Sequence, residues 1–339
     1  MADIIRVLIV DDSPLMRAAI KSIFEDDPAI EVVGLAKDGK EGVEKAAKLK
    51  PDVITMDLKM PIMSGLEAIE EIMQNNPVPI IVVSSLETAV IVKALGIGAM
   101  DFVSVTQDIN QIAQDLLEKV KIASRVRPLR RMKLSRVSSV KQPAPSLKRE
   151  ASRVLAIGIS TGGPQALQLL FAKLPANLPL GILVVQHMSK GFIEGLAEWI
   201  RATSALKIKV AKAGDTIKAG EVLLAPDDFH MKVNSSGMIV LSEEKCDGCH
   251  HIPSVDAMMC SVADAFGEAA IGLIMTGMGI DGVEGIKAIK KSGGRTIAQD
   301  ESSSVIFGMN KAAIESGAVD VVLPLEKIAE EIIRLAQGK

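Results

Sequence analysis

The feature that most constrains the fold of this chain is a repeated alternation of short apolar runs with longer segments of helical period. Within residues 1–121, five such runs predict strands. The first, "IRVLIV", is followed by the helix-starting pair Ser13 and Pro14 and by a helical segment over residues 15–24. Strands that alternate with helices form parallel sheets covered on both faces. These residues therefore predict an α/β domain with a five-stranded parallel sheet.

The alternation stops over residues 122–152 and then resumes. That segment contains proline, serine and many basic residues, with Glu150 as its single acid. We interpret it as a solvated basic linker rather than as an arm that binds nucleic acid. Residues 153–339 alternate again, which predicts a second, doubly wound α/β domain. The expected organisation is a domain over 1–121, a linker over 122–152 and a second domain over 153–339.

The composition excludes several other classes. Hydrophobic residues make up 48% of the chain and charged residues 24%, and the net charge of -3 gives no reason to expect nucleic acid or a membrane surface as an electrostatic partner. No apolar run has the length of a membrane span, and the N-terminal run ends in two aspartates rather than in a signal-peptide cleavage site. We expect a cytoplasmic protein, and its three cysteines argue against a disulfide framework.

Acidic side chains gather where the strands of the first domain are expected to end. Asp11 and Asp12 follow the first strand, Asp57 ends the third, and Ser84 and Ser85 follow the fourth. In open α/β sheets, ligands bind at this edge. Three carboxylates repel one another unless a cation joins them, and hard oxygen ligands suit Mg²⁺. A metal beside Asp57 would neutralise an incoming phosphoryl group, so that this aspartate could become an acyl phosphate.

The turn "IGISTGGP", over residues 157–164, separates an apolar run of the second domain from a helical segment. Its glycines would let backbone N–H groups approach a phosphate, although neither a Walker lysine nor the G-x-G-x-x-G spacing is present. The same residues fit a G-x-S-x-G nucleophile elbow with Ser160 at its apex. Ser160 could also serve only as a helix cap. The turn by itself leaves these interpretations open.

A serine nucleophile needs a base, and the base needs an orienting acid. His187 follows one apolar strand and Asp281 lies in a glycine-rich loop after another, so both are expected on the sheet edge that carries Ser160. His230 is the alternative base and would give the chain order of an α/β-hydrolase. Two function classes follow: a phosphorylation-controlled esterase, or a non-catalytic glycine-loop module that binds a nucleotide or a partner.

Four motifs of the first domain resemble those of the bacterial response-regulator receiver family: "VLIVDDSPLMR", "PDVITMDLKMPIMSGLEAI", "VVSSL" and "GAMDFV". The resemblance covers the whole domain and implies a flavodoxin-like sheet in which Asp57 accepts phosphate from a histidine kinase. It also implies an Mg²⁺ site made by Asp11, Asp12, Asp57 and the backbone carbonyl of Lys59, with Asp12 closest to the metal.

The receiver resemblance also assigns two switch positions and shows one departure. Ser84 takes the place of the hydroxyl that moves toward the phosphate, and Phe102 that of the switch aromatic. The family has a lysine, usually followed by proline, after the fifth strand, where this sequence has Val105 and Thr106. We therefore expect phosphorylation at Asp57 to remain possible and its coupling to the second domain to be weak.

Seven motifs of the second domain resemble, in order, those of the chemotaxis protein-glutamate methylesterase family, CheB: "IGISTGGPQAL", "VVQHMSKGF", "LLAPDDFHM", "PSVDAMM", "LIMTGMGIDGVEG", "TIAQDESSSVIFGMN" and "AAIESGAVDVVLPL". The resemblance implies Ser160 as nucleophile, His187 as general base and acid, and Asp281 as the orienting carboxylate. It also implies an oxyanion site at the backbone N–H of Met278, with Thr161 contributing.

The same resemblance implies substrates, partners and a mode of regulation. The substrates are glutamate methyl esters on methyl-accepting chemoreceptors and, for many members, glutamine side chains; a chemotaxis histidine kinase phosphorylates the receiver. The esterase reaction needs no cofactor. The protein would approach the membrane only through its receptors, and the unphosphorylated receiver would cover the esterase cleft.

A cluster of possible metal ligands stands just before the "PSVD" motif. It consists of Cys246, Cys249, His250, His251 and Cys260. C-x-x-C-H is the spacing of haem attachment, but that chemistry does not fit a chain without an export signal. Two Cys with a nearby His or Cys could bind zinc. The alternative, which we favour, is a polar loop at the rim of the substrate cleft.

Overall fold

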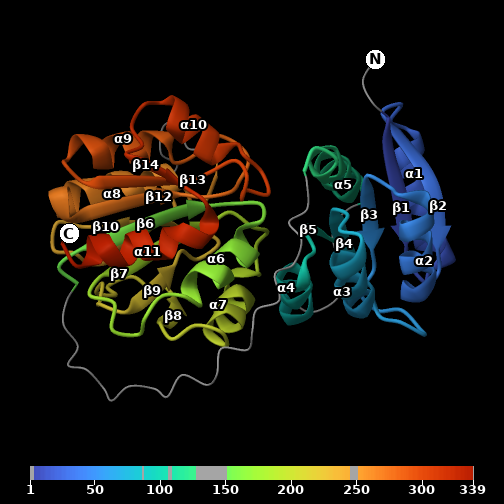
Figure 1. The fold of residues 1–339 in the computed structure, drawn as a ribbon, viewed down its shortest axis with the longest axis horizontal. Helices are drawn as coiled ribbons and strands as arrows, with labels where there is room; N and C mark the ends of the chain where they lie inside the picture. The colour runs from blue at the N-terminus through green and yellow to red at the C-terminus, as the bar shows by residue number, and fades with distance from the viewer. Residues whose placement is uncertain (1–3, 86–87, 106–108, 127–150, 245–250, 339) are drawn as a thin grey trace. The chain divides into compact units, whose positions relative to one another are not determined.

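The structure, a computed structural model, describes residues 4–85, 88–105, 109–126, 151–244 and 251–338. The chain divides into two compact units between Leu134 and Ser135 (Figure 1). Each unit is an α/β unit with its own parallel sheet. Within the described residues, no helix combines the length and the apolar character that crossing a membrane requires.

The first unit contains five strands and five helices. They are β1 Ile5–Val10, α1 Pro14–Glu25, β2 Ile30–Ala36, α2 Gly39–Leu49, β3 Val53–Met56, α3 Gly65–Asn75, β4 Ile80–Ser84, α4 Thr88–Ile97, β5 Asp101–Ser104 and α5 Ile109–Ala123. The strands form one parallel sheet in the order β2-β1-β3-β4-β5. Fold class and strand number agree with the sequence prediction.

The strand order of this sheet reverses between β1 and β3. The chain leaves β1 toward β2 and returns to place β3 on the other side of β1. At such a switch point the two loops diverge and leave a crevice at the carboxyl edge of the sheet, which is where ligands bind in α/β proteins. Asp11 follows β1 and Asp57 follows β3, so the topology itself brings these carboxylates to the crevice.

The second unit is larger. Its elements are β6 Val154–Ile159, α6 Gly163–Phe171, β7 Gly181–Gln186, α7 Ile193–Arg201, β8 Lys207–Val210, β9 Glu221–Leu224, β10 His230–Val233, β11 Ile239–Ser242, α8 Val255–Phe266, a 3₁₀ turn Gly267–Ala269, β12 Ala270–Ile274, α9 Val283–Lys291, β13 Arg295–Gln299, α10 Met309–Glu315, β14 Val321–Leu323 and α11 Leu325–Ala336. Seven strands form a parallel sheet in the order β14-β13-β12-β6-β7-β9-β8, and β10 and β11 form a separate antiparallel hairpin.

This second sheet also has a switch point, between β6 and β12. From β6 the chain continues to β7 on one side, and from β12 it continues to β13 on the other. Ile159 pairs with Gln186 of β7, and Gly158 pairs with Ile274 of β12. The residues that follow these three strands therefore emerge side by side at one edge of the sheet, which is the predicted position of Ser160, His187 and the loop that carries Asp281.

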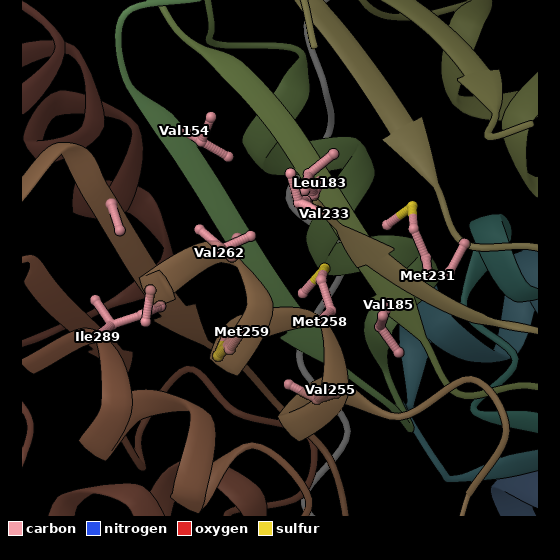
Figure 2. Packing of buried hydrophobic residues seen from close by; sticks show 14 of the residues in the cluster. Val154, Leu183, Val185, Met231, Val233, Val255, Met258, Met259, Val262 and Ile289 are labelled. Carbon is pink, nitrogen blue, oxygen red and sulfur yellow. The ribbon is translucent and has the colours of Figure 1, made fainter. Parts of the chain in front are cut away.

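Helix α8 covers the middle of the second sheet and reaches toward that edge. It packs on β6, on the β10 hairpin strand and on α9. Figure 2 shows its buried face, with Val255, Met258, Met259 and Val262 directed toward the apolar side chains of β6, β7 and β10. Burying a side chain of this size contributes about 1.5–3 kcal/mol. This packing fixes the axis of α8, and with it the position of the helix N-terminus.

Three features of the fold were absent from the sequence prediction. Helix α4 has the sequence "TAVIVKALGI", which is apolar on nearly every side and so lacks an amphipathic period. Strands β10 and β11 form a hairpin, in which the Asn234 side chain accepts from the amides of Ser236 and Met238 to form the turn. Strands β8 and β14 are short edge strands, too short for a clear apolar run.

Candidate functional site

Ser160 lies at the apex of a tight turn between β6 and α6. Its amide donates to the carbonyl of Thr276 (3.0 Å), and its carbonyl accepts from the amide of Gly163 (2.8 Å). Gly162 has φ +78°, a left-handed conformation that side chains rarely adopt, and this reversal lets the helix begin directly after the strand. The turn has the strand-turn-helix form of a nucleophile elbow.

His187 follows β7 beside this turn and contacts Asp281. The His187 amide donates to the carbonyl of Ile159 (2.9 Å), which holds the histidine next to Ser160 along the sheet edge. The ring atom Nε2 of His187 lies 2.9 Å from Oδ2 of Asp281, and both side chains are only 10% exposed. With the carboxylate on Nε2, the proton of the neutral ring belongs on Nε2 and Nδ1 is left as the acceptor.

Asp281 is held by the N-terminus of α8. Its Oδ1 accepts from the Ser254 hydroxyl (3.0 Å) and the Asp256 amide (2.9 Å), and its Oδ2 accepts from the Val255 amide (2.8 Å). Burial by itself raises the pKa of Asp281, but His187 and the amides of Asp256 and Val255 outweigh it and hold the pKa below its usual range. The group is therefore a fixed carboxylate, and the positive end of a helix favours its charge.

Asp256 makes the reverse contact with the next helix. Its Oδ1 accepts from the amide of Gly285 in the first turn of α9 (2.7 Å), while Asp281 just before α9 caps α8. Burial raises the pKa of Asp256 to about 6, with the Gly285 amide opposing the shift and the charge of Asp281 adding to it. The N-termini of α8 and α9 are thus linked by reciprocal hydrogen bonds. Of the two carboxyl groups, only Asp281 has a pKa below its usual range.

The loop after β12 lies directly behind the nucleophile. Gly277 donates to the carbonyl of Ile306 and accepts from the amide of Met309 (3.1 and 2.8 Å), and a Cβ on Gly277 would stand 2.7 Å from the Cβ of Ser160. The following residue, Met278, is 48% exposed. Gly277 therefore brings this exposed stretch of the chain close to the turn that carries Ser160.

Thr161 and Thr276 tie the elbow to this loop. The Thr276 hydroxyl donates to the Thr161 carbonyl (3.0 Å) and accepts from the Ile306 amide (2.9 Å). The Thr276 amide donates in turn to the side-chain oxygen of Gln299 (2.9 Å), at the end of β13. The nucleophile turn is thereby supported by the loop after β12 and, through it, by β13, which both lie on the same side of β6.

The structure gives His230, the alternative base, a different position. It is fully buried, and its Nδ1 accepts from the Ser254 amide (3.2 Å). Burial is the largest cause that lowers the pKa of His230, so the ring is neutral at physiological pH. A neutral histidine behind the start of α8 supports the capping segment that holds Asp281 and does not face the crevice.

The cluster before the "PSVD" motif is only partly described. Cys246, Cys249 and His250 lie outside the described residues. The ring of His251 stacks against the ring of His187, with centroids 4.5 Å apart. Burial raises the pKa of the Cys260 thiol, in α8, to about 11, which disfavours the thiolate that zinc requires.

In the first unit, the predicted phosphorylation site has the expected neighbours. The Ser84 hydroxyl donates to Oδ1 of Asp57 (2.9 Å). Burial raises the pKa of Asp57, and the bonds from Ser84 and from the backbone amides of Leu58 and Lys59 oppose this shift. Phe102, the predicted switch aromatic, is buried in the unit.

The acidic edge of this unit has the chemistry of a Mg²⁺ site. Asp11 is buried and accepts from the Ser13 amide (2.8 Å), while Asp12 is exposed. Burial raises the pKa of Asp11 to about 6; the Ser13 amide lowers it, and the charges of Asp57 and Asp12 raise it further. Neighbouring carboxylates whose charges repel one another, one of them buried, fit a divalent cation.

Within the described ranges, no three His, Cys, Asp or Glu side chains lie close enough together to hold a metal ion by themselves. Mg²⁺ needs only one or two carboxylates, because it keeps several waters.

Val105 occupies the place where receivers have a lysine, and its amide donates to the Ser84 carbonyl (3.3 Å). A lysine of α5, Lys119, lies 5.2 Å from the ring centre of Phe102 and is paired with Asp101 (3.2 Å). Asp101 begins β5, whereas Val105 follows its end. Lys119 therefore does not replace the missing lysine at the phosphorylation site.

The sequence analysis missed several residues that shape the site. Ser254, Asp256, Thr276 and Gln186 all bond to the residues or loops predicted to be catalytic. Only Ser254 had a readable signal, since serine at the start of a helical segment is a common N-cap. The others depend on contacts between segments far apart in the chain.

Together, these two units define a class: a response-regulator receiver joined to an α/β hydrolase unit. The family described as CheB methylesterase matches residues 155–332, and the response regulator receiver domain matches residues 7–117. The chain belongs to the CheB methylesterase family. Membership in this family favours the hydrolase over the non-catalytic glycine-loop module.

Relatives and a solved structure agree with this assignment. A protein-glutamate methylesterase/protein-glutamine glutaminase of Pyrococcus abyssi is 44% identical over 98% of this chain and 94% of its own length. Its counterpart from Thermotoga maritima is 43% identical over 98% of both chains. The crystal structure of the Thermotoga maritima CheB methylesterase catalytic domain is 40% identical, covers 54% of this chain and 98% of its own, and has a TM-score of 0.52.

Proposed function

We propose that the second unit hydrolyses methyl esters of glutamate side chains on chemoreceptors, with Ser160 as nucleophile, His187 as base and Asp281 as orienting carboxylate. The observation that carries this proposal is the contact of His187 Nε2 with Asp281 Oδ2 at 2.9 Å, beside the turn that carries Ser160. A carboxylate held by three donors from the start of α8 can orient the imidazole in the way that serine hydrolysis requires.

The proposed reaction begins with proton transfer from the Ser160 hydroxyl to Nδ1 of His187. The serine oxygen attacks the ester carbonyl, and backbone N–H groups at Met278, with Thr161 beside the nucleophile, stabilise the oxyanion. One such donor typically contributes about 2.7–4 kcal/mol. The C–O bond to methoxide breaks as His187 returns its proton, and methanol leaves.

Deacylation uses the same groups in reverse roles. His187 takes a proton from water, and the hydroxide attacks the acyl carbonyl of the Ser160 ester. The bond to the serine oxygen then breaks, His187 reprotonates that oxygen, and the glutamate carboxylate is released. The same acyl-enzyme would form from a glutamine side chain with ammonia as leaving group, so we include protein-glutamine deamidation in the proposed function.

We further propose that the first unit controls this activity. Asp57 would accept a phosphoryl group from a chemotaxis histidine kinase, with Mg²⁺ held by Asp11, Asp12, Asp57 and the backbone carbonyl of Lys59. The metal would neutralise charge on the transferring group. Support comes from the mutually repelling carboxylates at this edge, of which Asp11 is buried, and from the hydrogen bond that the Ser84 hydroxyl donates to Asp57.

The rest of the proposal concerns organisation and cellular setting. The receiver spans 1–121, the basic linker 122–152 and the esterase 153–339. In the resting state the receiver restrains the esterase, as the family resemblance implies. The protein works in the cytoplasm, meets the membrane only through its receptors, binds no nucleic acid and needs no cofactor for the esterase step.

The decisive experiment uses methylated receptor in membranes and measures released methanol. Ser160→Ala should abolish release while the circular dichroism spectrum and melting temperature stay close to those of the parent protein. Ser304→Ala is the matched serine control and should keep the rate. The Ser304 hydroxyl donates to the Asp300 carbonyl and accepts from the Asn310 side-chain amide, outside the turn that carries Ser160. Retained turnover in Ser160→Ala would exclude the proposed nucleophile.

A further inference from the structure

Gln186, the last residue of β7, connects the two loops that carry the proposed nucleophile and base. Its side chain is buried, 3% exposed. The amide nitrogen Nε2 donates to the carbonyl of Ser160 (2.8 Å) and to the carbonyl of His187 (2.8 Å). One side-chain group thus bonds to the backbone of both residues.

The chemistry of these contacts requires an amide. Both partners are carbonyl oxygens, which only accept, so the NH₂ group must face them and both of its hydrogens are used. A glutamate or an apolar side chain of the same length could not make either bond. The Ser160 carbonyl accepts a second bond from the Gly163 amide, so the backbone of the turn has little freedom left.

Gln186 is held in this place at a cost to stability. Its oxygen Oε1 is buried, and no hydrogen-bond donor reaches it in the part of the chain that the structure describes. A buried acceptor without a donor is destabilising, and a methionine of similar size would avoid that cost. The position is therefore better explained by the two bonds from Nε2 than by packing.

Gly163 is adapted to this amide. A Cβ at Gly163 would lie 1.9 Å from Oε1 of Gln186, far inside the distance of closest approach. The first residue of α6 must therefore lack a side chain for the amide to reach Ser160. Two positions that are far apart in the sequence thus serve the same bridge.

We propose that Gln186 is a positioning residue, which sets the separation and orientation of Ser160 and His187 by bonding to both of their carbonyl oxygens. It acts through those two residues and does not touch substrate. This inference rests on the proposed function, since it assumes that Ser160 and His187 react together.

The first test is Gln186→Met in the full chain, assayed by methanol release from methylated receptor. Displacing reacting groups by about an ångström lowers rates by about a hundredfold. We expect kcat to fall by about ten- to a hundredfold, KM to stay within about twofold and the pH midpoint of kcat/KM to stay where it is. A serine-directed covalent probe should still label every molecule at completion, but more slowly.

The matched control is Thr296→Val. Thr296 is also buried on a strand of this sheet, and its hydroxyl donates to the Ala318 carbonyl (2.7 Å), but it lies near the start of β13, away from the carboxyl edge. This variant should lower the melting temperature and leave kcat unchanged. A wild-type kcat in Gln186→Met, or an equal loss of kcat in Thr296→Val, would overturn the proposal.

Gly163→Ala offers an independent route that remains usable if Gln186→Met fails to fold. The new Cβ should displace the amide and reproduce the slow kcat. In a Gln186→Ala background, the same glycine change should cause no further loss, because the obstructing oxygen is gone. Additive losses in kcat would overturn the proposal.

A last comparison separates this inference from the proposed function. In a Ser160→Ala background, Gln186→Met should have no effect on the residual rate, because a positioning residue acts only through the group that it positions. Turnover in Ser160→Ala itself would refute the proposed nucleophile. An inactive Ser160→Ala beside a fully active Gln186→Met would refute only the role of Gln186.

Discussion

Replacing Asp281 by asparagine tests how the carboxylate works, because the change keeps size and removes one acceptor atom. The carboxylate accepts on Oδ1 from the Ser254 hydroxyl and the Asp256 amide, and on Oδ2 from the Val255 amide, with His187 also at Oδ2. An asparagine must put an NH₂ group at one of these two places. Neither arrangement satisfies all of the donors.

If the NH₂ group replaces Oδ2, it faces the Val255 amide and donates to His187 Nε2. The ring proton then moves to Nδ1, and the base is lost. If the NH₂ group replaces Oδ1, the Ser254 hydroxyl can turn to accept, but the Asp256 amide loses its partner. The first arrangement chiefly affects catalysis and the second chiefly affects stability.

The expected magnitudes follow from these two arrangements. Loss of the correct tautomer lowers kcat by about 10⁴-fold in a serine triad of known mechanism. An orphaned buried amide costs about 1–3 kcal/mol, and the lost attraction of a charge to a helix N-terminus costs about 0.3–1 kcal/mol. Relief of the burial cost of the charge offsets part of this, so we expect the free energy of unfolding to fall by about 1–3 kcal/mol.

The assay measures kcat and KM by methanol release, and the free energy of unfolding by urea titration at several pH values. KM should change little, because Asp281 does not touch substrate. The folded pKa of Asp281 is lower than the unfolded one, so its contribution to stability is fully present above the unfolded pKa, near pH 4. That contribution is lost as the pH falls through the folded pKa, so the variant and the parent should converge in acid.

Two outcomes would refute this reasoning. One is an Asp281→Asn enzyme with a kcat within about tenfold of the parent and an unchanged free energy of unfolding, since each arrangement requires one of these two losses. The other is a stability difference that grows toward acid pH. Asp264→Asn, a change of another acidic residue of α8, is the control and should leave kcat unchanged.

Ser254→Ala removes one donor to Asp281 and a helix cap, so stability should fall by about 0.5–2 kcal/mol with a moderate loss of kcat, measured by urea titration and methanol release. Chelation of Mg²⁺ should prevent labelling of Asp57 by a small phosphoryl donor, and labelling that persists in excess chelator would contradict the metal site. Val105→Lys should enlarge the phosphoryl-dependent activation of the esterase, which we expect to be modest in the parent; strong activation of the parent, lost in Asp57→Asn, would show that the lysine is dispensable. The fragment 150–339 should release methanol faster than the unphosphorylated full chain, and equal rates would argue against a covered cleft.

The sequence by itself determined the architecture and the positions of the reacting groups along the chain. Apolar runs such as Val154–Ile159 and Gly181–Gln186 are strands in the structure. In a parallel sheet the residue after each strand must emerge at the carboxyl edge, so Ser160 and His187 could be placed together from local patterns alone. The same reasoning placed Asp11 and Asp57 together in the receiver.

Only the tertiary structure decided how those groups are held. The N-terminus of α8 comes from a segment 25–27 residues before Asp281, and it caps that carboxylate because buried packing on the sheet fixes the helix axis. His230 could be read from sequence as a base, yet packing buries it behind Ser254. In the sequence, Gln186 looks like any last residue of a strand. Its side chain can bond to the Ser160 and His187 carbonyls only because Gly163 has no side chain to obstruct it. The positions of strands along the chain follow from local periodicity, whereas the direction of a buried polar side chain depends on neighbours that only chain folding brings together.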